Sequence, residues 1–538
     1  MIIPRAKQIK EYKTELKIVP PIRVYGSKRF SSFAVRYLQK LKIEAKAIGN
    51  AQGADLLLEE KKYSRREEYC LRVKDRITIS AENVSGLRNA ISSFAQCLVK
   101  KGESYRIRRL ELSDYPDNDY RGVMIDLARG LPDKDRLKED ILRLALVKCN
   151  TIHLHLMDRQ GICYDTKLFK HPSEIRGTKL YQKSDLKEFV KYCKSLAIDI
   201  IPEIEVPSHA HVLVEYNPFL ACKVDFENQS KAVVCGGNEK TYELYEKLIG
   251  EIADIFPYEY IHIGGDELYF PSETMNWRWH WNECSVCRAY MRKHGLNDRQ
   301  DLYYHLMRKM HDVALSHGKK TIMWNDQIDF SAPVSLPEDM IVQFWRFHGD
   351  EGRYSGKVTY ADFLNSPFEK VISPFNGCYI DIEDLTKLSD VEHYAPKRFG
   401  NPDNIQKQKI KGGDVCAWEY GNPAEEYKHY HISFFPCATV ILDKMWNEAE
   451  ANFCDVESGK ALTKLLLGSV CDGKTDVFSV FGSVFVPRTK KTSYLSRSNF
   501  SDAYIGQIKK YLQEAKTDTY SPIAIERIIE FLSRWRDE

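Results

Sequence analysis

The remaining sequence is organised around the stretch Tyr260-Ile-His-Ile-Gly-Gly-Asp266-Glu267-Leu268. It begins as a short β-prone run and stops at two glycines, which permit a tight turn and close approach of the backbone. Two adjacent carboxylates follow, and because one ionised carboxylate makes its neighbour harder to ionise, the pair can hold one proton near neutral pH. A protonated acid beside an anionic partner suits general acid catalysis, although these residues alone also suit an ordinary solvated loop.

Short apolar runs that are followed by polar residues and then by a helical pattern recur on both sides of this stretch. Parallel strands that are buried on both faces have this continuous apolar character, and eight of them in about 300 residues favour a (β/α)8 TIM barrel. An open doubly wound sheet is the alternative, but no Gly-x-Gly-x-x-Gly follows the first strand. The eight expected strands are residues 121–126, 151–157, 199–205, 260–263, 320–324, 340–344, 371–373 and 413–418.

The α/β chain is expected to contain three parts. Residues 1–115 predict a small α/β N-terminal domain, in which the alternating runs 68–73 and 76–81 form a hairpin. Residues 116–423 predict the (β/α)8 catalytic barrel, and residues 424–538 a mainly helical C-terminal region.

Two local features are predicted from turn and capping chemistry. The stretch Leu112-Ser-Asp-Tyr-Pro-Asp117 combines proline with Asx residues and indicates a linker before the barrel. Ser184 is expected to be the N-cap of a helix that runs to Leu196, with Asp185 in its first turn.

The composition describes a globular protein and sets limits on its partners. Of its 538 residues 43% are hydrophobic, and the net charge of +3 gives no case for a nucleic acid or an anionic membrane as partner. The N-terminus lacks the apolar stretch of a signal peptide, and the 14 cysteines are mostly isolated among hydrophobic residues. We therefore expect buried free thiols and a cytoplasmic location, with secretion only if a leader was removed.

Chemically active side chains gather where each expected strand ends, which is where the catalytic residues of a barrel lie. Structural readings are open for several of them: Arg129 could pair with Asp126, His153 could be a core histidine, and the tryptophans could fill the core. The residues at the eight strand ends are Asp126 and Arg129; His155 and Asp158; Glu203, Glu205 and His209; Asp266 and Glu267; Trp324 and Asp326; Trp345 and Arg346; Tyr379 and Asp381; and Trp418 and Glu419.

Five motifs in order along the chain are similar to those of a known family. The chain resembles glycoside hydrolase family 20, the β-N-acetylhexosaminidases, over roughly residues 120 to 420, and the N-terminal part resembles the small domain that precedes this family's barrel. The motifs are Arg121-Gly122 with Asp126 and Arg129; Asn150, His153, His155, Asp158, Gln160 and Gly161; Ile201-Pro-Glu-Ile-Glu-Val-Pro-Ser-His209; His262-Ile-Gly-Gly-Asp266-Glu267; and Tyr379-Ile-Asp381 with the late tryptophans.

The resemblance implies an exo-acting hydrolase that removes terminal β-linked N-acetylhexosamine, GlcNAc or GalNAc, from a glycan or glycoconjugate. Glu267 would be the general acid and then the base for water, while the substrate's own acetamido oxygen would act as nucleophile and form an oxazolinium intermediate. Asp266 would hold the acetamido N–H, and Tyr379 would donate to the acetamido oxygen. The resemblance implies no metal and no cofactor. The sugar-binding residues would be Arg129, Asp158, His209, Trp324, Trp345, Asp381, Trp418 and Glu419.

The sequence departs from the family pattern at several loops. Arg159 stands where a carboxylate is usual, Glu205 replaces aspartate, Ser208 replaces glycine, and Glu419 comes one place early. The sugar contacts of these loops, and the preference between GlcNAc and GalNAc, therefore stay open.

Two other function classes compete with the hydrolase, namely a sugar-binding protein with a degenerate site and a metal-dependent hydrolase that uses His153, His155 and the carboxylates. Cys284-Ser-Val-Cys287 is half of a zinc site, but no second Cys-x-x-Cys is near, so a loop with reduced thiols is expected. Trp277, Trp279 and Trp281 are a hypothetical subsite beyond the cleaved bond.

Overall fold

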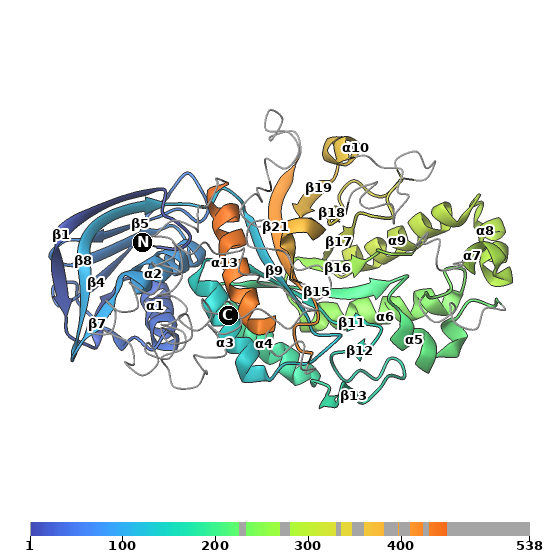
Figure 1. Cartoon of the computed structure of the whole chain (residues 1–538), viewed down its shortest axis with the longest axis horizontal. Coiled ribbons are helices and arrows are strands. Elements are labelled where there is room, and N and C mark those ends of the chain that lie inside the picture. The colour runs from blue at the N-terminus through green and yellow to red at the C-terminus, as the bar shows by residue number, and fades with distance from the viewer. Residues whose placement is uncertain are drawn as a thin grey trace, which may run out of the picture.

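Two sheets form the body of the molecule (Figure 1). The structure, a computed structural model, describes residues 2–224, 233–268, 280–329, 335–346, 360–380, 396, 409–422 and 430–448. The N-terminal sheet (blue) lies at one end, the parallel barrel occupies the rest, and helix α13 lies between them (Figure 1). The fold class expected from the sequence, a barrel preceded by a small α/β domain, is confirmed. The exact domain boundaries stay predictions.

The N-terminal sheet mixes parallel and antiparallel strands and is covered by α1, Lys28–Lys40, and α2, Val84–Cys97. The expected hairpin is confirmed, because Tyr69–Val73 pairs antiparallel with Ile77–Ala81. The strands are β1 Gln8–Ile18, β2 Ile22–Tyr25, β3 Ala45–Ala47, β4 Leu56–Glu60, β5 Tyr69–Val73, β6 Ile77–Ala81, β7 Val99–Lys101 and β8 Ser104–Asp114, in the order β1-β8-β5-β6-β4-β2-β3 with β7 beside β8.

The expected linker begins later than its composition indicates. Strand β8 continues through Leu112 and Ser113 to Asp114, so the first half of the predicted linker is wrong. The strand continues because Asp114 is a buried partner: Tyr69 and the Trp446 indole donate to it, and Lys148 forms an ion pair of 2.8 Å with it.

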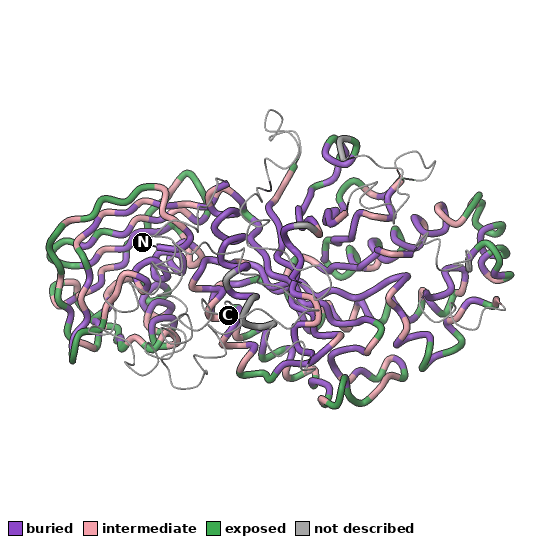
Figure 2. The backbone as a smooth tube through the Cα atoms, viewed as in Figure 1, coloured by how far each residue is buried: buried purple, intermediate pink, exposed green. Residues whose placement is uncertain are grey.

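A closed barrel of eight parallel strands forms the centre of the chain. Every neighbouring pair among these eight is parallel, and β21 closes the ring on β9, with Gly413 opposite Arg121. The barrel strands are almost entirely buried, whereas β1 at the sheet edge is largely exposed (Figure 2). All eight expected strands are confirmed: β9 Tyr120–Asp126, β10 Thr151–His155, β15 Asp199–Val206, β16 Tyr260–Gly264, β17 Lys320–Trp324, β18 Ile341–Phe344, β19 Glu369–Ile372 and β21 Ile410–Ala417.

Helices follow most barrel strands, and short elements decorate the loops. Helix α4 begins at Lys183 with Gln182 as N-cap in a capping box with Asp185, so the prediction of Ser184 as the cap is wrong. The helices are α3 Lys134–Leu146, α4 Lys183–Ser195, α5 His211–Tyr216, η1 Pro218–Leu220, α6 Glu239–Ile255, α7 His280–Glu283, α8 Ser285–His294, α9 Arg299–Ser316, α10 Tyr360–Asn365, α11 Phe375–Cys378 and α13 Tyr430–Asn447. The short strands are β11 Met157–Asp158, β12 Gly161–Ile162, β13 Glu174–Ile175, β14 Thr178–Lys179 and β20 Tyr379–Ile380.

Buried charges join the N-terminal domain to the barrel. Glu67 pairs with Arg121 at 2.6 Å and lies 3.8 Å from Arg88, and all three side chains are buried. Burial disfavours the Glu67 anion, but the two guanidinium groups outweigh it and lower the pKa of Glu67 to about 2. Arg121, which begins a family motif, therefore holds the two domains together.

The C-terminal region is helical where the structure describes it. Helix α13 packs against β9 and β21, and its Trp446 donates to Asp114 of the N-terminal sheet at 2.9 Å. Of the expected helix at 424–431, only the last two residues are described, and they lie in α13. The expected helix at 503–515 lies outside the described residues. None of the described helices combines the length and apolarity needed to cross a membrane.

Candidate active site

Residues 264–267 form a strained turn at the C-terminal end of β16. Gly264 and Gly265 have φ angles of 62° and 94°, and Glu267 also lies in the left-handed region with φ of 53°. A non-glycine residue pays for this conformation, so the surroundings must hold it. The hydroxyl of Tyr303 donates to the Gly265 carbonyl at 2.7 Å, and the hydroxyl of Ser208 donates to the Asp266 carbonyl.

Asp266 and Glu267 share His209 as a partner but differ in their other contacts. The Glu267 backbone N–H donates to Asp326 Oδ2 at 2.9 Å, while its carboxylate lies 3.0 Å from His209 Nε2. The same His209 nitrogen lies 3.4 Å from Asp266 Oδ2. Asp266 Oδ1 is buried and has no hydrogen-bond partner among the described residues. One oxygen of the pair is thus a buried acceptor ready for a donor from outside the protein.

The environment of Asp266 makes a second negative charge on the carboxylate pair costly. Burial first, and then the carboxylates of Asp326 and Glu267, raise the pKa of Asp266 to about 7, although His209 opposes the shift. Adjacent carboxylates titrate as a pair, so the pair retains one proton up to about neutral pH.

A chain of alternating charges extends from this pair across the barrel. His209 Nδ1 lies 3.2 Å from Asp158, and Asp158 forms a 2.6 Å ion pair with Arg129. Arg129 also pairs with Asp126 at 2.9 Å, and its guanidinium lies 4.9 Å from the centre of the Trp418 ring. The structural reading of Arg129 as a partner of Asp126 and the functional reading as a site residue are therefore compatible.

The alternation of charge fixes the ionisation of the chain. Burial disfavours the charged form of His209, but Asp158 and Asp266 outweigh it and raise the pKa of His209 well above its usual value. Burial likewise opposes ionisation of Asp158, yet Arg129 and then His209 hold the pKa of Asp158 well below its usual range. His209 is therefore a cation beside the carboxylate pair.

Aromatic rings wall the space next to the carboxylates. Trp345 and Tyr379 stack with ring centres 5.9 Å apart at 8°, and Tyr379 lies 5.6 Å from Trp418. Trp324 packs in the same cluster. The Trp418 indole N–H is buried and has no acceptor among the described residues. The ends of the last four barrel strands thus supply an apolar wall that also carries the buried Trp418 N–H, which suits the face of a sugar ring.

Glu203 is the hub of a buried layer beneath the site. Its Oε1 accepts from the Trp324 indole at 2.7 Å and lies 2.9 Å from His262, and its Oε2 lies 2.6 Å from His155 and 3.2 Å from His153. Three histidines around one carboxylate also resemble a metal-ligand set. The short contacts among these groups account for their arrangement as a hydrogen-bonded core, which agrees with the structural reading of His153.

Glu205, one of the departures from the family pattern, lies behind Asp266. Burial, and then the charges of Asp266 and Glu203, raise the pKa of Glu205 well above its usual value, so it is a neutral acid. A Cβ on Gly264 would stand 2.0 Å from Glu205 Oε2. Gly264 therefore makes room for the longer side chain that replaces aspartate here.

The structure brings the expected site residues together at one end of the barrel, with three qualifications. Asp381, Trp277 and Trp279 lie outside the described residues. Trp281 is buried and donates to the Val234 carbonyl at 3.0 Å, so its assignment to a subsite is wrong. Glu419 is held by Asn422 and Arg176, and its backbone N–H donates to Asp126.

Asp326 has a role that sequence reasoning did not assign. It accepts from the Glu267 backbone at 2.9 Å and from the Trp345 indole at 3.1 Å, and thereby ties the turn at residues 264–267 to the aromatic wall. Its position at the end of the fifth expected strand marked Asp326 as a candidate site residue. Its contact with the Glu267 backbone arises only because β16 and β17 are neighbours in the barrel.

The family is decided by a match to its profile. Residues 118–449 match "Glycosyl hydrolase family 20, catalytic domain". The chain belongs to glycosyl hydrolase family 20. Its expected family is thereby confirmed, and the eight strand ends described above are those of a family 20 barrel.

Known proteins resemble the chain in sequence and in fold. A "Beta-hexosaminidase" of Porphyromonas gingivalis is 28% identical over 432 residues, which are 73% of this chain but 52% of that protein, so the chain spans about half of that relative. One from Akkermansia muciniphila is 29% identical over 366 residues, 62% of this chain and 70% of that protein. The β-N-acetylhexosaminidase structure from Bacteroides fragilis has a TM-score of 0.74 at 22% identity and covers 87% of this chain and 95% of that one.

Replacement of Gly264 by alanine is expected to damage the site more than its backbone conformation alone explains. Gly318 has a similar φ, 69° against 62°, but a Cβ there meets nothing within 4 Å. Both Gly→Ala changes carry a conformational cost of about 1 kcal/mol. Gly264→Ala adds the overlap with Glu205 and displaces the carboxylate pair, so kcat/KM on an aryl N-acetylglucosaminide is expected to fall about 100-fold. Gly318→Ala is expected to keep full kcat/KM, and equal activities of the two variants would contradict this account.

Proposed function

We propose that the protein is an exo-acting β-N-acetylhexosaminidase that removes terminal β-linked GlcNAc or GalNAc with retention of configuration. The observation that carries the proposal is the division of the carboxylate pair. Asp266 Oδ1 is buried and has no hydrogen-bond partner in the part of the chain that the structure describes, while Glu267 is oriented by His209 and Asp326. In this proposal, each carboxylate acts on a different atom of the same sugar. Membership of family 20 and relatives named beta-hexosaminidase support the same reaction.

In the first step the acetamido oxygen of the substrate attacks its own anomeric carbon. The bond from that carbon to the leaving oxygen breaks, and Glu267 gives its proton to the leaving oxygen. Asp266 accepts a hydrogen bond from the acetamido N–H and stabilises the positive charge of the oxazolinium ring, and the Tyr379 hydroxyl donates a hydrogen bond to the acetamido oxygen. Because the nucleophile is held within the substrate, the gain in rate comes from orientation.

In the second step water attacks the anomeric carbon while Glu267, now a carboxylate, takes its proton. The oxazolinium ring opens and the acetamido group is restored. His209 stays cationic beside both carboxylates and offsets the charge that develops on Glu267. Two inversions at the same carbon return the β configuration.

The polar chain and the aromatic wall supply the sugar contacts in this proposal. Trp345, Tyr379 and Trp418 pack against the ring and the acetamido methyl, and Arg129 binds hydroxyls on the far side while Asp126 and Asp158 hold it in place. A structure of the exo β-N-acetylglucosaminidase of Vibrio harveyi holds N-acetylglucosamine, and that chain matches this one with a TM-score of 0.70 at 21% identity over 86% of this chain and 75% of its own.

Two expectations from the sequence accompany the proposal. We propose a glycan or glycoconjugate with terminal N-acetylhexosamine as the partner, with neither nucleic acid nor membrane, and a reducing compartment such as the cytoplasm. None of the twelve cysteines among the described residues is in a disulfide, which supports the second point.

Glu267→Gln and Asp266→Asn are expected to separate the two carboxylate roles. With nitrophenyl β-GlcNAc and β-GalNAc, each variant is expected to lose about 100-fold to 10,000-fold in kcat/KM. The loss in Glu267→Gln should shrink as the leaving phenol becomes more acidic, because a weakly basic leaving oxygen needs less protonation. The loss in Asp266→Asn should depend little on the leaving group.

Glu283→Gln is the matched control, because Glu283 is an exposed carboxylate on α7. It should leave kcat/KM unchanged, and the melting temperatures of all variants show whether each is folded. A folded wild-type protein without activity on either glycoside would sink the hydrolase proposal and favour the sugar-binding alternative. Full activity after exhaustive chelation with metal loss verified would exclude the metal-dependent alternative.

The pH profile is expected to fall on its alkaline side near neutrality. The active form of the enzyme carries one proton on the carboxylate pair, and the raised pKa of Asp266, about 7, marks the loss of that last proton. Above this pH the pair is doubly ionised, so no proton remains for the leaving oxygen. kcat/KM should therefore decline about tenfold per pH unit above about pH 7. A constant kcat/KM up to about pH 9 would contradict the assignment.

A further inference from the structure

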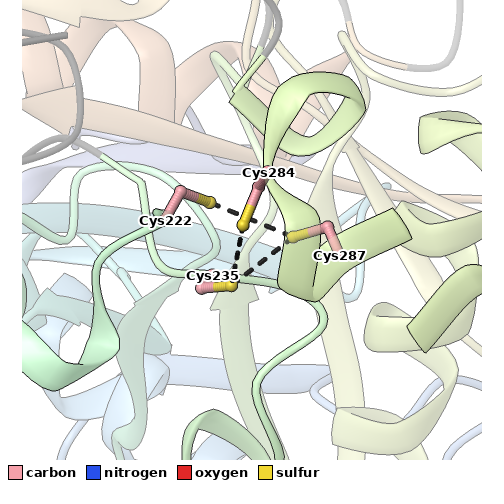
Figure 3. A group of neighbouring side chains, drawn as sticks. All are labelled: Cys222, Cys235, Cys284 and Cys287. Carbon is pink, nitrogen blue, oxygen red and sulfur yellow. Dashed lines mark hydrogen bonds between the residues drawn. The ribbon is translucent and has the colours of Figure 1, made fainter. Parts of the chain in front are cut away.

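Four cysteines, two from the loop between η1 and α6 and two from the start of α8, meet in a buried cluster (Figure 3). Cys222 follows η1, Cys235 precedes α6, and Cys284 and Cys287 lie at the start of α8. All four are buried, and their sulfur atoms lie within 4.8 Å of one another. In the sequence, Cys284 and Cys287 form only half of a zinc site. Cys222 and Cys235, which lie well before them in the chain, supply the other two sulfur atoms.

The sulfur separations match a tetrahedral metal site. The Sγ atom of Cys235 lies 3.8 Å from the Sγ atom of Cys284 and 3.4 Å from that of Cys287. The Sγ atoms of Cys222 and Cys287 lie 4.0 Å apart. Four thiolates at the usual Zn–S distance of about 2.3 Å stand about 3.8 Å apart at the corners of a tetrahedron. A disulfide needs sulfur atoms about 2 Å apart, which none of these pairs approaches.

The backbone around the cluster is shaped to bring the loops together. A Cβ on Gly237 would stand 2.5 Å from the Cys287 Cα, and a Cβ on Gly236 would stand 2.7 Å from the Trp281 ring, so these two glycines permit the approach of the two loops. Tyr242 donates to the Gly236 carbonyl at 2.7 Å, and Thr241 to the Cys235 carbonyl at 2.9 Å. Within the loop between η1 and α6, the antiparallel pairing of Ala221 with Val234 brings Cys222 and Cys235 together.

The N-terminus of helix α8 lies at the cluster. Cys284 is the N-cap of α8 and Cys287 lies in its first turn, where the partial positive charge of the helix N-terminus stabilises an anion. Several buried thiolates repel one another, and a divalent cation compensates their charge.

We propose that Cys222, Cys235, Cys284 and Cys287 bind one structural zinc ion. Four thiolates in tetrahedral arrangement select zinc or iron–sulfur chemistry rather than magnesium or calcium, and four protein ligands leave no open position for catalysis. The ion joins the loop that leaves β15, which carries Ser208 and His209, to the segment that follows Asp266 and Glu267. It thereby ties together the two loops whose contact orients the general acid.

Metal analysis of the full chain tests this site without reference to sugar hydrolysis. Protein purified without a metal-chelating column is expected to hold about one zinc per chain by mass spectrometry of the elements. Modification of its thiols with a mercurial should release that zinc, detected with a metallochromic dye, as about four thiols react. Replacement of zinc by cobalt should give the strong sulfur-to-metal charge-transfer absorption of a tetrahedral thiolate site.

Cys284→Ser with Cys287→Ser should abolish zinc binding and lower the melting temperature, whereas Cys193→Ser, a buried cysteine on α4, should retain about one zinc per chain. If the double variant fails to fold, the stoichiometry and the cobalt spectrum of the wild-type chain still decide the matter. Wild-type protein with four free thiols and no zinc, with a disulfide among these cysteines, or with iron in place of zinc would overturn the proposal.

Discussion

The site depends on the electrostatic problem of placing two adjacent carboxylates at the end of a buried strand. Asp266 and Glu267 cannot both ionise at low cost there, and the cation of His209, which contacts both carboxylates, lowers that cost. His209 is stabilised by Asp158, Asp158 pairs with Arg129, and Arg129 also pairs with Asp126. The row of charges that runs across the barrel is therefore the consequence of one carboxylate pair. It also keeps Glu267 oriented in a left-handed backbone conformation that a glutamate would not adopt by itself.

The fold was predictable from the sequence where burial dictates the pattern. Barrel strands such as β9 and β15 are buried on both faces and read as apolar runs, so all eight were found. Strand β1, Gln8–Ile18, was missed because its exposed edge position permits a charged sequence, and the end of β8 was taken for a linker because Asp114 is polar although buried. Gln182 rather than Ser184 caps α4, since tertiary placement and a reciprocal bond with Asp185 outweigh intrinsic capping preference.

The site was predictable to the extent that its residues stand at strand ends. Arg129, His209, Asp266, Glu267 and Tyr379 follow from that rule and from the family motifs. The link from Asp326 to the Glu267 backbone and the position of Glu205 behind Gly264 depend on which strands become neighbours, which no local pattern contains. The four cysteines are the clearest case, because Cys222 and Cys235 have no motif of their own and acquire meaning only beside Cys284 and Cys287.

The central claim is that the nucleophile belongs to the substrate and that Asp266 serves it. The most direct measurement is kcat/KM for aryl β-glucosaminides whose N-acetyl group carries none, one, two or three fluorine atoms, since each fluorine weakens the acetamido oxygen as a nucleophile without changing the leaving group. The account predicts a steep fall along the series, by about tenfold or more per step. A flat series would contradict it and would require a nucleophile supplied by the protein.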